Sequence, residues 1–223
     1  MVLFFAVWLY PVSDDTTRTI GLILVPLIWV SLVVLVWKNR LVHIALLAVT
    51  VAIGFFMILP ARTQRDVAVL RSDYVAGLRR YSGVRYYWGG ESPKGIDCSG
   101  LIRRGMIDAL FLHGIQSADP GLVRYSIWIW WHDCTAADFG SDRSLTARCF
   151  TVPSINLLDH SRVLPGDLAV TTSGAHIMAY LGSNAWIEAD PDVGRVITEQ
   201  AASTRNRWFL TPMNIVRWNI LEN

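Results

Sequence analysis

The stretch RYYWGGESPKGIDCSGLI, residues 85–102, contains the features that decide the fold of this chain. An aromatic run, a Gly-Gly pair and a Ser-Pro-Lys-Gly turn lead to Cys98, and an apolar periodic segment begins directly after it. This pattern predicts a loop that ends at the N-terminus of a helix, where peptide dipoles and free N–H groups favour a negatively charged side chain. Cys98 is therefore a candidate nucleophile, although a cysteine taken alone is more often a buried structural residue.

The composition indicates a membrane part and a soluble part. Charged residues make up only 17% of the 223 residues, and the mean hydropathy is positive, which is too apolar for an ordinary soluble domain. The formal charge of +2 and the lack of a Lys/Arg-rich run argue against a nucleic-acid partner. The three cysteines include no C-x-x-C pair, so we expect no metal site, no redox site and no cofactor.

Two apolar runs, Ile20–Trp37 and Leu41–Leu59, contain no Asp, Glu, Lys or Arg. As helices of about 18–20 residues they would be roughly 27–30 Å long, which is enough to cross a bilayer. The segment 38–40 predicts a tight turn, so we expect residues 1–61 to form a membrane anchor in which two transmembrane helices make a hairpin. The apolar segment Met1–Val12 is too short to span a membrane and is expected at the interface or packed against the hairpin.

The charges next to these runs bear on their orientation. Lys38 and Arg40 favour a cytoplasmic turn, whereas Arg62 and Arg65 after the second run favour the opposite arrangement. With the turn inside, the chain from Ala61 onward would lie outside the cytoplasmic membrane.

Residues 62–223 are expected to form one soluble domain of the α+β class. Apolar positions at three- and four-residue steps predict helices within 62–81 and from Cys98 to about His113. Later the pattern changes to short β-type segments separated by turns, at 168–172, 176–181, 185–189, 195–199 and roughly 208–218. Helices followed by such a meander predict helices packed on a small antiparallel sheet.

The region 117–162 predicts an inserted subdomain. It contains turn signals, the run Ile127–Trp131 and the cysteines Cys134 and Cys149. The Trp-rich run fits either core packing, which is slightly favoured, or an aromatic patch facing a membrane or a glycan. We also expect Cys134 and Cys149 to form a disulfide that closes a loop of about 15 residues, with two unpaired thiols as the alternative.

Two downstream residues can complete a catalytic group around Cys98. His176 opens a predicted strand after the small residues 173–175, and it is the best candidate for the base that a nucleophilic thiol needs. Glu188 lies one strand further on, where a hairpin can bring it beside His176 to orient the imidazole and favour its protonated form.

Four ordered motifs resemble the NlpC/P60 cysteine peptidase family. They are YYWGGESPKGIDCSGL at 86–101, LPGDL at 164–168, HIMAYLG at 176–182 and WIEA at 186–189, in that family's order. The likeness covers roughly residues 67–218, with the insertion as a gap. An ordered fourfold match is far more specific than one short motif.

The resemblance implies a papain-like α+β domain that hydrolyses an amide bond in peptidoglycan stem peptides, often the bond between D-glutamate and the diamino acid. The family's nucleophile falls on Cys98 and its base on His176. Tyr86, Asp97 and Ser99 fall on family positions beside the substrate cleft.

Three features depart from the family pattern. Glu188 stands where the family most often has His, and sometimes Asn or Gln, and a carboxylate can fill the same orienting role. The region 117–162 replaces a much shorter connection. The membrane hairpin takes the place of a signal peptide, a lipoprotein anchor or wall-binding repeats.

The sequence thus predicts a membrane-anchored cysteine hydrolase whose partners are a peptidoglycan stem peptide and the lipid bilayer. Its expected location is the bacterial inner membrane with the catalytic domain on the extracytoplasmic side, where the hairpin also offers a surface to a membrane-protein partner. Two other interpretations stay open. One is a thiol acyl hydrolase or transferase acting on lipid, and the other is a weakly catalytic wall-binding scaffold module, which Glu188 and the Trp-rich run would suit.

Overall fold

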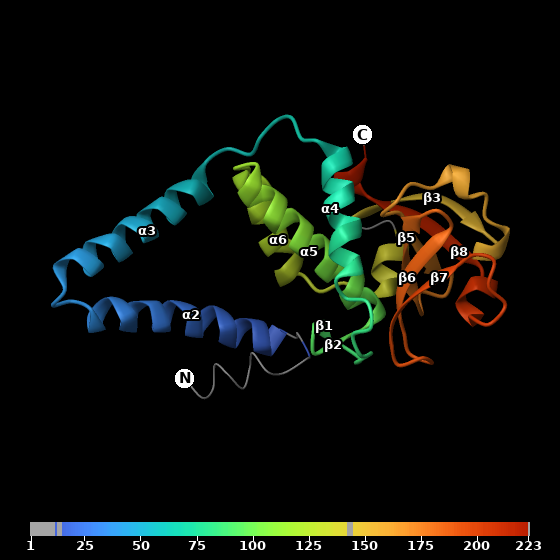
Figure 1. Cartoon of the computed structure of the whole chain (residues 1–223), viewed down its shortest axis with the longest axis horizontal. Helices are drawn as coiled ribbons and strands as arrows, with labels where there is room; N and C mark the ends of the chain where they lie inside the picture. The colour runs from blue at the N-terminus through green and yellow to red at the C-terminus, as the bar shows by residue number, and fades with distance from the viewer. Residues whose placement is uncertain (1–11, 13–14, 142–144, 223) are drawn as a thin grey trace.

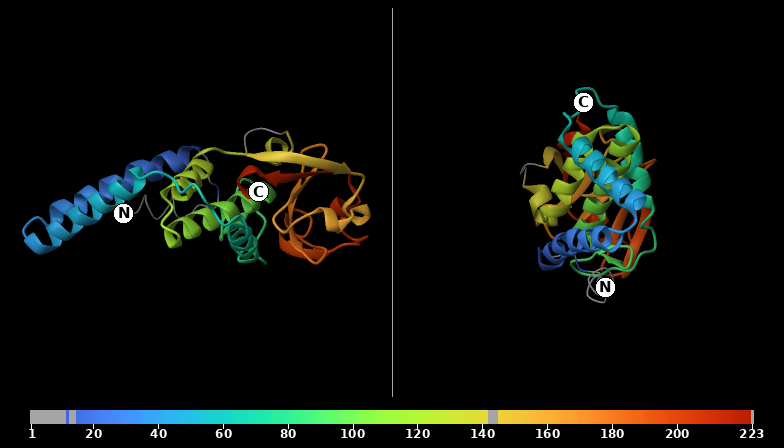
Figure 2. Two further views of the ribbon diagram at one scale, coloured as in Figure 1. Left: turned by 90° about the horizontal axis from the view of Figure 1, so that it is seen from above. Right: turned by 90° about the vertical axis from the view of Figure 1, so that its left-hand side faces the viewer.

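The chain is seen in a computed structural model that describes Val12, residues 15–141 and residues 145–222 (Figure 1). Two N-terminal helices project from a body in which a layer of helices packs against a six-stranded sheet (Figures 1 and 2). This arrangement confirms the α+β class. The expected interfacial segment Met1–Val12 lies outside the described residues, apart from Val12.

The two projecting helices are α2 (Asp15–Leu35) and α3 (Arg40–Ile58), which contain most of the two apolar runs. Both are long and apolar enough to cross a membrane by length and composition, and almost none of their residues is buried. The turn between them ends at Asn39, whose side chain accepts the Val42 N–H and so caps α3. Further along the hairpin, the Trp29 indole donates to the Thr50 hydroxyl at 3.1 Å and links the two helices.

Three helices of the body each begin directly after an aspartate whose carboxylate accepts an N–H of the first turn. They are α4 (Val67–Arg79) after Asp66, α5 (Cys98–Gln116) after Asp97 and α6 (Pro120–Trp131) after Asp119. An aspartate in this position satisfies a helix N–H that has no partner within the helix, so it specifies where the helix starts. The central helix α5 packs between α4 and α6, and more than half of its residues are buried.

The sheet is antiparallel, with strand order β3-β8-β4-β5-β6-β7. Its strands are β3 (Thr146–Val152), β4 (Leu168–Thr171), β5 (Ile177–Gly182), β6 (Ala185–Asp190), β7 (Arg195–Gln200) and β8 (Met213–Trp218). One face packs on the helices, and the other is covered by the 3-10 segments η1 (Ile155–Leu157) and η3 (Arg207–Leu210). Because both faces are covered, β4, β5 and β6 are buried at nearly every position rather than at alternate ones.

The region 117–162 contributes to both layers of the body. Helix α6 packs along α5, α7 (Ala136–Gly140) packs on β4, and β3 pairs with β8 at the edge of the sheet. A short segment η2 (His160–Arg162) follows β3 and η1, and η4 (Asn219–Leu221) follows β8. The last expected strand, 208–218, begins only at Met213, because residues 207–210 form η3 instead.

Helix α6 divides the Trp-rich run between two environments. Ile129 is fully buried and Trp130 is half-buried, whereas the side chains of Ile127, Trp128 and Trp131 are exposed. Helical periodicity separates the two groups onto opposite sides of α6. Core packing, the slightly favoured interpretation, therefore accounts for only one side of the helix.

The expected disulfide between Cys134 and Cys149 is wrong, since both cysteines are free. Cys134 lies after α6, near Asp138, Asp133 and Arg103. Cys149 is exposed on β3, near a different set of charged residues, Arg217, Asp167 and Glu222. The α7 helix and the pairing of β3 with β8 direct the two side chains into different surroundings.

Candidate active site

The loop before Cys98 folds back tightly onto the start of α5. Its short hairpin pairs β1 (Glu91–Ser92) with β2 (Gly95–Ile96), and the Gly90 carbonyl accepts the Asp97 N–H at 3.0 Å. A Cβ on Gly100 would lie 2.1 Å from the same carbonyl oxygen. Only glycine allows the loop and the first turn of α5 to approach this closely, so these small residues set the position of Cys98.

Asp97 ties the loop and the helix together. Its carboxylate accepts the Gly89 N–H at 2.8 Å, the Gly100 N–H at 2.6 Å and the Ser99 hydroxyl at 3.0 Å. Asp97 and Ser99, both expected beside the substrate cleft, therefore flank Cys98 and are paired with each other. Because it accepts these three hydrogen bonds, the Asp97 carboxylate mainly fixes the local backbone.

Cys98 is the first residue of α5 and is 8% exposed. The N–H groups at the start of a helix have no acceptor within the helix, and the helix dipole there favours negative charge. Cys98 therefore lies at the positively polarised end of α5. Free N–H groups at a helix start can in general stabilise an oxyanion, although that of Gly100 already donates to Asp97 here.

His176 and Glu188 are brought together by the pairing of β5 with β6. His176 directly precedes β5, and the strands pair with Ala179 opposite Ile187, a register that carries Glu188 towards the start of β5. Nε2 of His176 bonds to Oε2 of Glu188, and each residue is 1% exposed. His176 and Glu188 thus lie in contact, and both are buried from solvent.

The pKa of His176 is raised to about 9. Burial acts in the opposite direction, but hydrogen bonds with Cys98 and Glu188, together with the charges of both groups, outweigh it. The imidazole is therefore protonated near neutral pH. Since Nε2 faces Glu188, the Nδ1 side of the ring is the one left to face the sulfur of Cys98.

Two residues around this pair were not expected from the sequence. Asn206 is buried and donates from Nδ2 to Glu188 and, at 3.1 Å, to Glu199. The ring of Trp208 stacks on that of His176, with centroids 4.2 Å apart and planes 13° from parallel. Trp208 lies in η3, where a strand was expected to begin. Asn206 directly precedes η3 and caps it by accepting the Trp208 N–H at 2.9 Å.

Tyr86 lies near Cys98 and is half-buried. Its backbone N–H donates to Gly194 at 2.8 Å, which ties the loop to the turn between β6 and β7. Burial and the nearby Cys98 and Asp97 raise the pKa of the phenol above its ordinary value. Tyr86 therefore keeps its proton and can donate a hydrogen bond next to the sulfur.

An ionic cluster connects this loop to the first projecting helix. Glu91, on β1, pairs with Arg18 of α2 at 3.3 Å and with Arg103 of α5 at 3.1 Å, and all three side chains are buried. Arg103 also binds Asp133 at 2.6 Å. Burial raises the pKa of Glu91, although the two arginines act against that rise. The start of α2 is thus fixed to the loop that carries Cys98.

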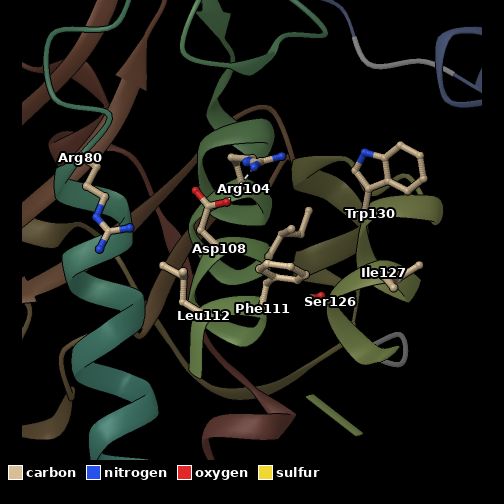
Figure 3. A pocket seen from close by; sticks show the side chains of 9 residues that line it. Arg80, Arg104, Asp108, Phe111, Leu112, Ser126, Ile127 and Trp130 are labelled. Atoms are coloured by element: carbon tan, nitrogen blue, oxygen red, sulfur yellow. Dashed lines mark ion pairs between the residues drawn. The ribbon is translucent and has the colours of Figure 1, made fainter. Parts of the chain in front are cut away.

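A cavity of about 410 Å³ lies away from the catalytic group, between α4, α5 and α6 (Figure 3). Its lining includes Arg80, Arg104 and Asp108 together with apolar side chains such as Phe111 and Ile127. In the part of the chain that the structure describes, no group of three or more His, Cys, Asp or Glu side chains is arranged to hold a metal ion.

Comparison with known proteins finds a family match for one segment of the chain. Residues 83–120 match the model of the NlpC/P60 family, a range that contains Cys98 and the whole of α5. No curated protein matches the chain.

Three solved structures are among those similar to it. NlpC2 from Trichomonas vaginalis is 19% identical with a TM-score of 0.45, and the match covers 70% of this chain and 50% of that one. The P60 domain of an antigen from M. avium subspecies paratuberculosis is 20% identical with a TM-score of 0.43, covering 70% and 98%. The peptidoglycan hydrolase RipB from Mycobacterium tuberculosis is 19% identical with a TM-score of 0.43, covering 70% and 67%. This chain thus spans half the length of the first.

Proposed function

We propose that the chain is a membrane-anchored cysteine hydrolase that cleaves amide bonds in peptidoglycan stem peptides, starting from the match of residues 83–120 to the NlpC/P60 family model. The single observation that carries the proposal is the position of His176, which is hydrogen-bonded to Glu188 on one side and to Cys98 on the other. A thiol, a base and an orienting group in this order are what nucleophilic amide cleavage requires.

In the proposed reaction the Cys98 thiolate attacks the carbonyl carbon of the scissile amide. The carbonyl oxygen takes up the negative charge and is stabilised by N–H groups at the start of α5. The C–N bond then breaks, and His176 gives its Nδ1 proton to the leaving nitrogen, which departs as an amine. The acyl group remains on the sulfur as a thioester.

Water completes the cycle. The neutral His176 takes a proton from a water molecule that attacks the thioester, and the carboxylic acid and the Cys98 thiolate are released with His176 protonated again. Throughout, Glu188 holds Nε2–H, which keeps Nδ1 directed at the sulfur and favours the imidazolium. Asn206 holds the second carboxylate oxygen of Glu188 and so restrains its rotation.

The residues beside Cys98 are proposed to contact the substrate. Tyr86 can donate its phenol proton to a substrate oxygen because its raised pKa keeps it neutral. Ser99 and Asp97 form the other wall, in which Asp97 acts mainly by holding the backbone. A bond between D-glutamate and the diamino acid is the proposed site of cleavage.

The proposed location follows from α2 and α3. Their length and apolar surface suit two spans of a bilayer, and Lys38 and Arg40 in the turn favour its cytoplasmic side. The body would then face the extracytoplasmic side of the inner membrane, where peptidoglycan lies.

The test is digestion of purified peptidoglycan by the detergent-solubilised full chain, followed by mass spectrometry of the fragments. We expect new free amino groups from the intact chain and none from Cys98→Ala, with fragment masses that identify the D-glutamyl bond. A Cys149→Ala variant is the matched control, because that thiol is free and exposed and its removal should leave amine release unchanged. Equal amine release by Cys98→Ala would refute the proposal.

A further inference from the structure

Helix α6 contacts both helices of the α2–α3 hairpin at the end where they join the body. Near its middle, Arg124 donates to the carbonyls of Met57 and Leu59 at the end of α3, at 2.7 and 2.8 Å. At its C-terminus, the Trp131 carbonyl accepts from Arg18 at the start of α2, at 3.4 Å. The points where the two helices leave the body are therefore held by the same short helix.

The orientation of α6 follows from these two attachments. In Figures 1 and 2 the hairpin extends away from the body on one side, α5 and α6 lie next to its open end, and the sheet lies on the far side of these helices. Helix α6 runs across the direction of the hairpin rather than along it (Figure 1). If α2 and α3 cross a bilayer, α6 lies at the level where the two spans emerge, because it is bonded to the body end of each.

The side of α6 that faces away from the core has a membrane-interface composition. Arg124, Ile127, Trp128 and Trp131 are spaced by three and four residues, so they share one face of the helix. The two tryptophans and Ile127 are 38–44% exposed, whereas the opposite face is buried against the core. Tryptophan is enriched at the level of lipid headgroups, where its ring is apolar and its N–H can bind water or an ester oxygen.

We infer that this face of α6, formed by Arg124, Ile127, Trp128 and Trp131, binds the headgroup layer of the bilayer. The inference rests on the proposed membrane anchoring by α2 and α3. The occupant is lipid because the face is continuous with the two apolar helices, which are held to α6 at the points where they join the body.

The consequence is a fixed distance between the membrane and Cys98. Helix α6 packs along α5, and Cys98 is the first residue of α5. A body that is held by two spans alone could tilt about its attachments, whereas a third contact along α6 defines a plane. The catalytic group is then held at one height above the membrane and reaches only wall strands close to it.

The experiment is photo-crosslinking of the full chain in vesicles of phosphatidylcholine and phosphatidylglycerol. A trace phosphatidylcholine with a diazirine near its glycerol backbone is irradiated, and labelled peptides are identified by mass spectrometry. We expect label in α2, in α3 and in α6. The peptide that contains Leu157, an apolar residue 73% exposed in η1 on the far face of the sheet, serves as the negative control.

A double substitution, Trp128→Ser with Trp131→Ser, tests the role of the face directly. Both rings are exposed, so the body should remain folded, and label in α6 should fall by about fivefold or more while label in α2 and α3 is unchanged. Label in α2 and α3 without label in α6 would overturn the inference and leave the anchoring intact. Absence of label from α2 and α3 would instead refute the anchoring on which it rests.

Discussion

Replacing Glu188 by glutamine removes one negative charge from the centre of the site with little change in shape. Glu188 is 1% exposed and its two oxygens bind His176 and Asn206. The amide of glutamine can accept one of these hydrogen bonds, but its NH₂ group must then face a second donor. The variant therefore separates the effect of the Glu188 charge on activity from the effect of the side chain's size.

The magnitude follows from the hydrogen bonds. A hydrogen bond to a charged group contributes about 1.5–3 kcal/mol, against about 0.5–1.5 for a neutral pair, so the loss is about 1–1.5 kcal/mol. Since 1.36 kcal/mol corresponds to one decade in rate or one pKa unit, kcat/KM should fall about tenfold and the pKa of His176 by about one unit. The intact chain should lose activity as the pH rises through about 9, where the imidazolium deprotonates. In Glu188→Gln this alkaline limb should lie at lower pH.

The assay is the pH dependence of kcat/KM for a soluble stem peptide, with amine release as the readout. The matched control is Glu199→Gln, which removes the same charge from the other carboxylate that binds Asn206 but does not contact His176. It should leave both the rate and the alkaline limb nearly unchanged. An unshifted limb in Glu188→Gln, or an equal loss in both variants, would refute the role given to Glu188.

Three further outcomes are expected. Gly100→Ala should lower the free energy of unfolding by about 3 kcal/mol, because its Cβ would lie 2.1 Å from the Gly90 carbonyl oxygen. The control Gly54→Ala, with open space around the added Cβ, should change the melting temperature little. Equal melting temperatures of the two variants would contradict the close approach of the loop to α5. Thiol counting under denaturing, non-reducing conditions should find all three cysteines free, and a count of one would restore the disulfide. The pKa of His176 in the folded chain, about 9, exceeds its ordinary value of 6.5, so the stability that protonated His176 contributes is complete below pH 6.5 and is lost as the pH rises through about 9. The melting temperature should therefore fall over this pH range in the intact chain but not in His176→Gln. Parallel melting curves of the two proteins would contradict this contribution.

Local patterns predicted the elements that carry the site. Cys98 at the start of α5 follows from a loop with turn residues before an apolar periodic run, and the short β-type segments correspond to β4 through β7. The contact of His176 with Glu188 could be expected because a hairpin joins the strands next to them. These signals lie within a few residues of each other in the sequence.

The features that were missed depend on contacts between distant segments. Strand β3 exists because β8, far along the chain, pairs with it, and no local pattern contains that partner. Asn206 reaches Glu188 because η3, which Asn206 caps, packs on the sheet. The spacing of Cys134 and Cys149 allowed a disulfide, but the direction of each side chain was set by α7 and by the register of β3.

The most direct test of the central claim is a comparison of the three thiols within one chain. Brief alkylation by iodoacetamide at pH 7, with each cysteine followed by mass spectrometry of its peptide, reports how much of each thiol is present as thiolate. Burial raises the pKa of Cys134 to about 11 and also raises that of Cys149, so both should react slowly, although Cys149 is exposed. If Cys98 is paired with a protonated His176, it should react about tenfold faster than Cys149 despite being only 8% exposed, and His176→Ala should remove this difference. Faster alkylation of Cys149 than of Cys98 in the intact chain would contradict a nucleophile at the start of α5.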